Sequence, residues 1–341
     1  MIVTGDTNFY RKIVEGISIR SMWKVDAIVK ELKIAESNKG IRAMMGSIAA
    51  SELLSHLLDD HKSRDYRSCL EACKVMYGHC KVDENSFNLL PSPQTQIAME
   101  YFGKINQLAI NTQQIMGGVM SQIAKEPNRK TIIKFSSELS QVKNHIQSTE
   151  QCLINEVQLM CKRIDPSYTD WHLFVGDKKK RAAYLSFIRS HAFKDQTACA
   201  MLVAVNMQLT QQGLLPQQPV VTQNMVNTFI GSYQVALSLR EFFFSQFLNP
   251  GFDLSTKSRA NFLWDEQILY FVGKQVDNED VILLTSDTKM CDAAQNCGVR
   301  DKVRKYDEYI EELGIAPALN AIKKGRCCYA WFWIKRALHL N

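Results

Sequence analysis

Strand-forming sequence occurs at the two ends of this chain. The segment VILLT at 281–285 has five apolar or β-branched residues between Asp280 and Ser286, which is typical of a buried strand. MIVTG at 1–5 has the same character. Helical sequence follows both segments, and alternation of strands with helices indicates a parallel sheet covered by helices. The fold class predicted is therefore α/β, with one parallel-sheet core formed by both ends of the chain.

The helices of this core can be placed from capping residues and apolar spacing. Asn8 is expected to cap a helix that reaches Ile17, and a leucine-rich helix is expected near 47–60. Beyond the second strand, glycines are expected to end two helices at their C-termini. The elements predicted there are a helix at 289–296, a short strand at 303–306 and a helix at 308–314 capped by Asp307.

The middle of the chain has no convincing strand and reads as helix. Only 16 glycines and 8 prolines occur in 341 residues, which favours helix. Long periodic stretches are found at 94–125, 130–163, 179–212 and 222–248. The predicted division is a first part of the core at 1–61, a helical insertion at 62–255, a second part of the core at 256–315 and a helical tail at 316–341.

The cysteines and the apolar runs indicate a cytoplasmic protein without a membrane span. The longest apolar run, Ala198 to Val205, is far too short to cross a bilayer, and the N-terminus lacks a signal-peptide pattern. Ten cysteines in such a chain are expected to be free thiols in a reducing compartment. The cluster Cys69, Cys73, His79 and Cys80 lacks a second CxxC arm, so buried thiols are expected there rather than zinc ligands.

The net charge of +6 is unevenly distributed. Two basic clusters have a composition that suits a polyanion such as RNA, although a solvated helix face is the alternative for each. The residues concerned are Lys178, Lys179, Lys180 and Arg181 in the first cluster, and Lys323, Lys324 and Arg326 in the second.

Three acids stand at informative positions. Asp6 and Asp287 each follow a predicted strand, and the carboxyl ends of parallel strands face the usual ligand crevice. Asp265 lies on the apolar stripe of a helix and therefore points inward, where a carboxylate needs a partner or a metal. Glu52 lies opposite a leucine stripe, so periodicity alone predicts that it faces solvent.

Five segments, taken in order, resemble the PIN domain nucleases. In that family a first strand runs into Asp-x-Asn or Asp-x-Ser, a helix then carries an acid, another acid opens a later helix, and a strand ends in Thr-x-Asp. A helix, a short strand and a final helix complete the pattern. The matching segments are GDTN at 5–8, GSIAASELLSHL at 46–57, WDEQILYFVG at 264–273, VILLTSD at 281–287 and KMCDAAQNCGVRDKVRKYDEYIEELG at 289–314.

The resemblance implies a ribonuclease in which Asp6, Glu52, Asp265 and Asp287 hold Mg²⁺ or Mn²⁺. Hard oxygen donors of this kind suit those ions, which would activate water for phosphodiester hydrolysis. Side chains beside the acids would hold the carboxylates by hydrogen bonds. They are Asn8, Thr285 and Ser286.

The chain departs from the family in one large feature. The stretch between Glu52 and Asp265, which should be a few short helices, exceeds 200 residues. This insertion could clamp the substrate, form a homo-oligomer interface or bind a protein partner. Two other functions stay open: a non-catalytic PIN-like module that binds RNA or protein, and a phosphatase similar to the haloacid dehalogenases. The phosphatase is disfavoured because Asn8 stands where that family has a second aspartate.

Overall fold

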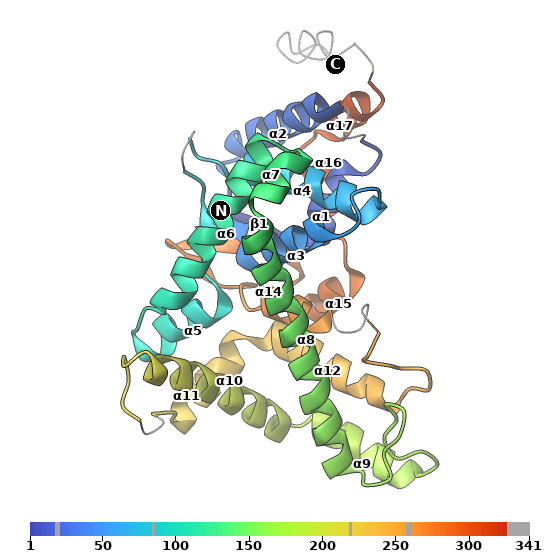
Figure 1. Cartoon of the computed structure of the whole chain (residues 1–341). Helices are drawn as coiled ribbons and strands as arrows, with labels where there is room; N and C mark the ends of the chain where they lie inside the picture. Colours follow the sequence, from blue (N-terminus) through green and yellow to red (C-terminus); the bar gives the residue numbers. More distant parts are fainter. Residues whose placement is uncertain (18–20, 84–85, 218–219, 257–260, 326–341) are drawn as a thin grey trace.

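The chain is mixed α/β and mostly helical, with a small mixed sheet. The computed structural model describes residues 1–17, 21–83, 86–217, 220–256 and 261–325 (Figure 1). The predicted tail therefore falls largely outside the described residues, and α17 (Ala316–Lys323) is its described helix. Within these ranges, no helix is both long and apolar enough to cross a membrane.

Two strands from opposite ends of the chain form the centre of the sheet. Strand β1 (Ile2–Gly5) pairs in parallel with β6 (Glu279–Thr285), with Gly5 opposite Leu284. Both strands predicted near these positions are confirmed. The sheet is extended in parallel by β2 (Arg42–Ala43) beside β1 and by β7 (Val303–Lys305) beside β6.

The expectation of a purely parallel sheet is wrong, because β5 (Gln275–Val276) pairs with β6 in the antiparallel sense. The turn between them contains Asp277 and Asn278 at φ values of 53° and 62°. Asn and Asp tolerate this left-handed backbone better than most residues, and two such residues in succession favour a tight hairpin. A second, two-stranded sheet is formed by β3 (Met45–Gly46) and β4 (Leu89–Leu90).

Helix α2 (Met22–Ser37) was not predicted, whereas the other helices of both ends lie near their predicted positions. Two predicted caps are wrong. Asp6, not Asn8, is the N-cap of α1, because its carboxylate accepts the N–H of Phe9. Lys305, not Asp307, precedes the first residue of α16. The helices and 3₁₀ turns of the two ends are α1 (Thr7–Val14), α2 (Met22–Ser37), α3 (Ser47–Ser55), η2 (His56–Leu58), α14 (Phe262–Leu269), α15 (Thr288–Asn296), η4 (Arg300–Lys302) and α16 (Tyr306–Glu312).

The predicted helical character of the middle is confirmed except at the two-residue strand β4, and each long periodic stretch is divided into two helices. At Gly103, for example, a left-handed φ of 60° ends α5. These elements are α4 (Arg64–Cys80), α5 (Pro93–Phe102), α6 (Gln107–Lys125), α7 (Arg129–Lys134), α8 (Ser136–Ile164), α9 (Lys178–Ile188), α10 (His191–Gln211), α11 (Gln223–Ser232), α12 (Gln234–Ser245) and η3 (Gln246–Leu248).

The sheet separates two hydrophobic cores. Because side chains alternate along a strand, Ile282 and Leu284 of β6 face one core, whereas Leu283 faces the other. The first core contains α1 to α4, α6 and α16, so helices from the predicted insertion pack directly beside the N-terminal helices. The second core contains α8 to α12 with α14 and α15.

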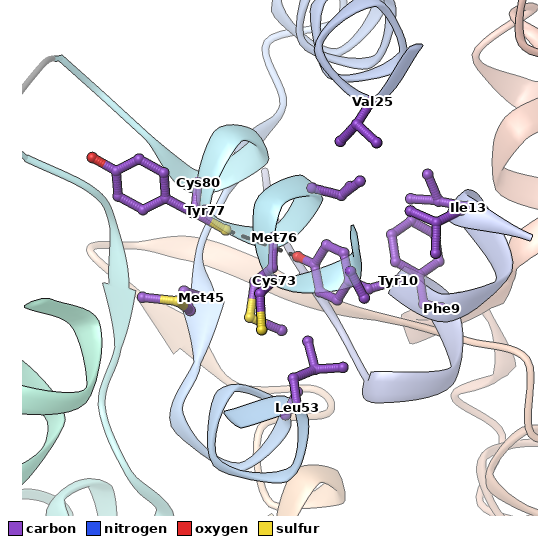
Figure 2. Packing of buried hydrophobic residues seen from close by; sticks show 14 of the residues in the cluster. Phe9, Tyr10, Ile13, Val25, Met45, Leu53, Cys73, Met76, Tyr77 and Cys80 are labelled. Atoms are coloured by element: carbon purple, nitrogen blue, oxygen red, sulfur yellow. Dashed lines mark hydrogen bonds between the residues drawn. The ribbon is translucent and has the colours of Figure 1, made fainter. Parts of the chain in front are cut away.

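Helix α1 is anchored in the first core by aromatic and sulfur-containing side chains. Figure 2 shows Phe9 and Tyr10 packed among Leu53 of α3 and Cys73 and Met76 of α4. The Tyr10 hydroxyl also lies 3.8 Å from the Sγ of Cys80. The three cysteines of the sequence cluster discussed above are buried free thiols. This packing fixes α1, and with it the end of β1.

Candidate active site

Asp6 stands at the junction between β1 and α1, and its side chain is only 2% exposed. Its Oδ1 accepts the Phe9 N–H at 2.6 Å, and its Oδ2 accepts the Thr285 hydroxyl at 2.5 Å. The parallel pairing of β1 and β6 brings Thr285 to this position. Thr285 therefore forms a hydrogen bond with the Asp6 carboxylate, and its role beside a metal-binding acid stays a prediction.

Asp287 follows β6 and caps α15. Its carboxylate accepts the N–H of Lys289 at 2.6 Å, and its own N–H donates to the Thr285 hydroxyl oxygen at 2.9 Å. One threonine thus connects the two acids that end the central strands. Asn8 and Ser286 are exposed, and within the described ranges neither forms a hydrogen bond with any of the four predicted acids.

Glu52 on α3 faces the same region, although helix periodicity alone placed it in solvent. Its Oε2 accepts the hydroxyl of Thr7 at 2.5 Å, and Thr7 is the residue that follows Asp6. The side chain is half-buried because α8 packs over this face of α3 and covers it. The expectation from helix periodicity, that Glu52 faces solvent, is therefore wrong. Its role as a metal ligand, implied by the PIN resemblance, stays a prediction.

Asp265 on α14 is half-buried and lines a cavity, whereas its neighbour Glu266 is the fully buried acid of this helix. Among the described residues the Asp265 carboxylate has no hydrogen-bond or ion-pair partner. Burial raises its pKa well above the ordinary range, and the charges of Glu52, Asp287 and Asp6 raise it further. A half-buried carboxylate without a donor is the type of group that a cation would stabilise.

Asp6, Glu52 and Asp265 line one cavity of about 210 Å³. They come from three elements that are far apart in the sequence. Burial raises the pKa of Asp6 to about 7, and the hydrogen bonds from Thr285 and Phe9 only partly oppose this effect. Burial likewise raises the pKa of Glu52 to about 7, against the opposing hydrogen bond from Thr7. Asp287 does not line the cavity, but its charge acts on both aspartates.

Basic side chains lie on the wall of the cavity. Asp59 accepts a hydrogen bond from Lys143 Nζ of α8 at 2.7 Å, and its other oxygen lies 2.8 Å from His56 Nδ1. These two bonds hold the pKa of Asp59 below its ordinary value even though burial acts in the opposite direction. Arg11 lines the cavity as well. The cavity therefore presents carboxylates together with cations, an arrangement suited to a phosphate group and a metal ion.

The donor chemistry of the acids fits a hard divalent cation, since all four are carboxylates. Over the residues that the structure describes, however, no three His, Cys, Asp or Glu side chains are already arranged as a metal site. The hydroxyls of Thr285 and Thr7 currently bind Asp6 and Glu52. These acids therefore satisfy their oxygens through hydroxyl groups in this arrangement.

The predicted basic clusters have different locations. Helix α9, which carries Lys178, Lys179, Lys180 and Arg181, lies at the end of the molecule far from α1 (Figure 1). Arg181 also donates a hydrogen bond to the carbonyl of Leu248. Lys323 of the second cluster lies beside α1, because its Nζ donates a hydrogen bond to the carbonyl of Lys12 on that helix. Lys324 is exposed, and Arg326 lies outside the described residues.

Sequence reasoning missed several residues of this cavity. Thr7 had a usable signal, since it stands between two predicted site residues in the first turn of α1. The residues at the ends of η2 and on α8 had no usable signal in the sequence, because their proximity to the acids depends on how α8 packs across α3. They are His56, Asp59, Lys143, Gln147 and Glu150.

No family model, no curated protein and no solved structure matches this chain. Its function is therefore inferred from the geometry and chemistry of the site itself.

Proposed function

We propose that the chain is a metal-dependent ribonuclease of PIN type that hydrolyses phosphodiester bonds. The observation that carries this proposal is the convergence of Asp6, Glu52 and Asp265 on one cavity, with Asp287 acting electrostatically on the two aspartates. Buried carboxylates that raise one another's pKa are costly in structural terms and frequent at functional sites.

The four carboxylates would hold Mg²⁺ or Mn²⁺, which supplies an activated water and stabilises charge on the phosphate. Thr285 orients Asp6 and positions the N–H of Asp287 through one hydroxyl. Thr7 orients Glu52 in the same manner. Lys143 and Arg11 would contact the substrate phosphate, because both line the cavity.

A non-catalytic module that binds RNA is the second candidate, and a specific observation favours it. The described residues do not present an assembled set of three metal ligands, and two threonines bind two of the acids. In that case the acids would be structural, and loss of their charge would not affect any reaction.

Cleavage of labelled single-stranded and hairpin RNA with Mn²⁺ or Mg²⁺ separates the two. The variants are Asp265→Asn and Asp287→Asn, and the matched control is Asp292→Asn, an exposed acid on α15. We expect cleavage by the wild type and the control, and none by the site variants or in EDTA. Tight RNA binding without cleavage by the wild type would instead support the non-catalytic module.

A further inference from the structure

A larger depression lies beside the carboxylate cavity, along α1 and the beginning of α4. Its volume is about 1230 Å³. We call it the α1–α4 groove. Its walls carry mainly charged and polar side chains, and the basic residues are Arg11, Lys12, Lys62, Arg64 and Arg67.

The groove has more positive than negative groups. Its lining has five basic residues but only three acids, Glu15, Asp65 and Glu71. Arg11 pairs with Asp65, and Lys12 lies 2.7 Å from Glu15. Burial raises the pKa of Glu71 to about 7, so this acid carries less negative charge near neutral pH.

Three cations of the groove are available to a ligand. Lys62, Arg64 and Arg67 are exposed, and none of them forms a side-chain hydrogen bond or ion pair within the described part of the chain. They lie at 62–67, where the sequence alternates basic residues with others and shows no continuous basic run. Lys323 extends the cationic surface, since its Nζ contacts the backbone of Lys12.

The groove adjoins the carboxylate cavity. Asn8 and Arg11 line both. An extended polyanion that lies against Arg64 and Arg67 can therefore pass Arg11 and reach the acids. Proteins that bind single strands without sequence preference use positively charged grooves of this type.

We propose that the α1–α4 groove binds the sugar–phosphate backbone of a single-stranded nucleic acid and leads it into the carboxylate cavity. The inference rests on the proposed nuclease function and adds its substrate class. The carboxylate cavity is small, about 210 Å³, so we expect a single strand rather than a duplex to bring a phosphate to Asp6 and Asp265.

The test measures binding in EDTA, where no cleavage occurs, with the full chain and fluorescent 20-nucleotide strands. The groove variant combines Lys62→Ala, Arg64→Ala and Arg67→Ala. The control combines Lys178→Ala, Lys179→Ala and Lys180→Ala, which removes the same charge from α9. Probes are single-stranded RNA, single-stranded DNA and a duplex, with polyglutamate as competitor, and thermal melts verify that both variants fold.

We expect the groove variant to bind single strands at least tenfold more weakly, and the control to bind like the wild type. Each lost phosphate contact should reduce the salt slope of log K by about 0.7, so three contacts reduce it by about 2. Comparison of the affinities for single-stranded RNA and single-stranded DNA shows whether the groove discriminates between ribose and deoxyribose. Equal binding by the groove variant and the wild type would overturn the inference, and so would duplex binding as tight as single-strand binding or equal competition by polyglutamate.

Cleavage assays separate this inference from the proposed function. If the wild type cleaves and the groove variant cleaves at the same rate, the groove proposal fails while the nuclease stands. If the groove variant loses binding but the wild type never cleaves, the groove proposal stands while the nuclease proposal fails.

Discussion

Replacing Asp6 with asparagine should stabilise the chain at neutral pH in the absence of metal. The side chain is 2% exposed, and burial raises its pKa from 3.8 to about 7. Asparagine has nearly the same shape and can still accept the Phe9 N–H, but it has no charge to bury. The wild type must ionise a buried group as the pH rises, whereas the variant does not.

The size of the effect follows from proton linkage. Because the folded pKa is raised, the stabilising contribution of protonated Asp6 is complete below about pH 3.8 and is lost as the pH rises through about 7. Each pH unit well below the folded pKa lowers the free energy of unfolding by about 1.36 kcal/mol, and the decrease levels off above pH 7. The wild type therefore loses about 3 kcal/mol between pH 5 and pH 8. At about 2.1 cal/mol/K per residue, 341 residues give an unfolding entropy of about 0.7 kcal/mol/K, and the loss corresponds to about 4 °C in Tm.

Thermal melts in EDTA from pH 5 to pH 8 measure this difference. The Tm of Asp6→Asn relative to wild type should rise by about 4 °C across the window, while Asp292→Asn should show no such trend. Added Mn²⁺ should raise the Tm of the wild type more than that of Asp6→Asn, because a ligand stabilises the state that binds it. A variant that melts below the wild type by a constant amount at every pH would refute the reasoning and identify Asp6 as an ordinary helix cap.

Three further changes test other parts of the structure. Gly5→Ala would place a Cβ 2.6 Å from an aromatic ring of α1, so we expect a loss of about 1–3 kcal/mol in denaturant unfolding, whereas Gly118→Ala, which meets nothing within 4 Å, should be neutral or stabilising. Arg240→Leu should cost about 3–5 kcal/mol because it leaves the Glu266 carboxylate buried without its partner, and Arg240→Leu with Glu266→Leu should recover most of that loss. Lys143→Ala should lower kcat/KM for RNA about 10- to 100-fold, since a charged contact to phosphate contributes about 1.5–3 kcal/mol, and should lower the Tm only slightly, because a partly exposed ion pair with Asp59 is lost.

Strands β1, β6 and β7 were predictable because their signal is local, whereas the two-residue strands β2, β3, β4 and β5 were not. A run such as VILLT buries both faces of a central strand, and β6 does have side chains in both cores. The breaks inside the long helical stretches were not predictable in this manner. A single glycine ends α5, and no proline or glycine separates α7 from α8 at Phe135. Such breaks depend on packing between distant segments.

The site residues also differ in whether a local sequence signal or long-range packing determines their positions. Asp265 could be placed from periodicity because burial of its helix face is visible in the neighbouring residues. Glu52 could not, because its burial depends on α8, which begins more than 80 residues later. The PIN-like pattern selected Glu52 where amphipathicity argued against it. The basic residues of the α1–α4 groove are interrupted in sequence and gather only through the packing of α1 against α4.

Two helices from the middle of the chain help to position Asp265. On one side of this residue, the indole N–H of Trp264 donates to Glu150 of α8 at 2.8 Å. On the other side, Glu266 forms a two-point ion pair with Arg240 of α12 at 2.7 and 3.0 Å. These two helices therefore hold the backbone of α14 on either side of the carboxylate that has no donor of its own among the described residues.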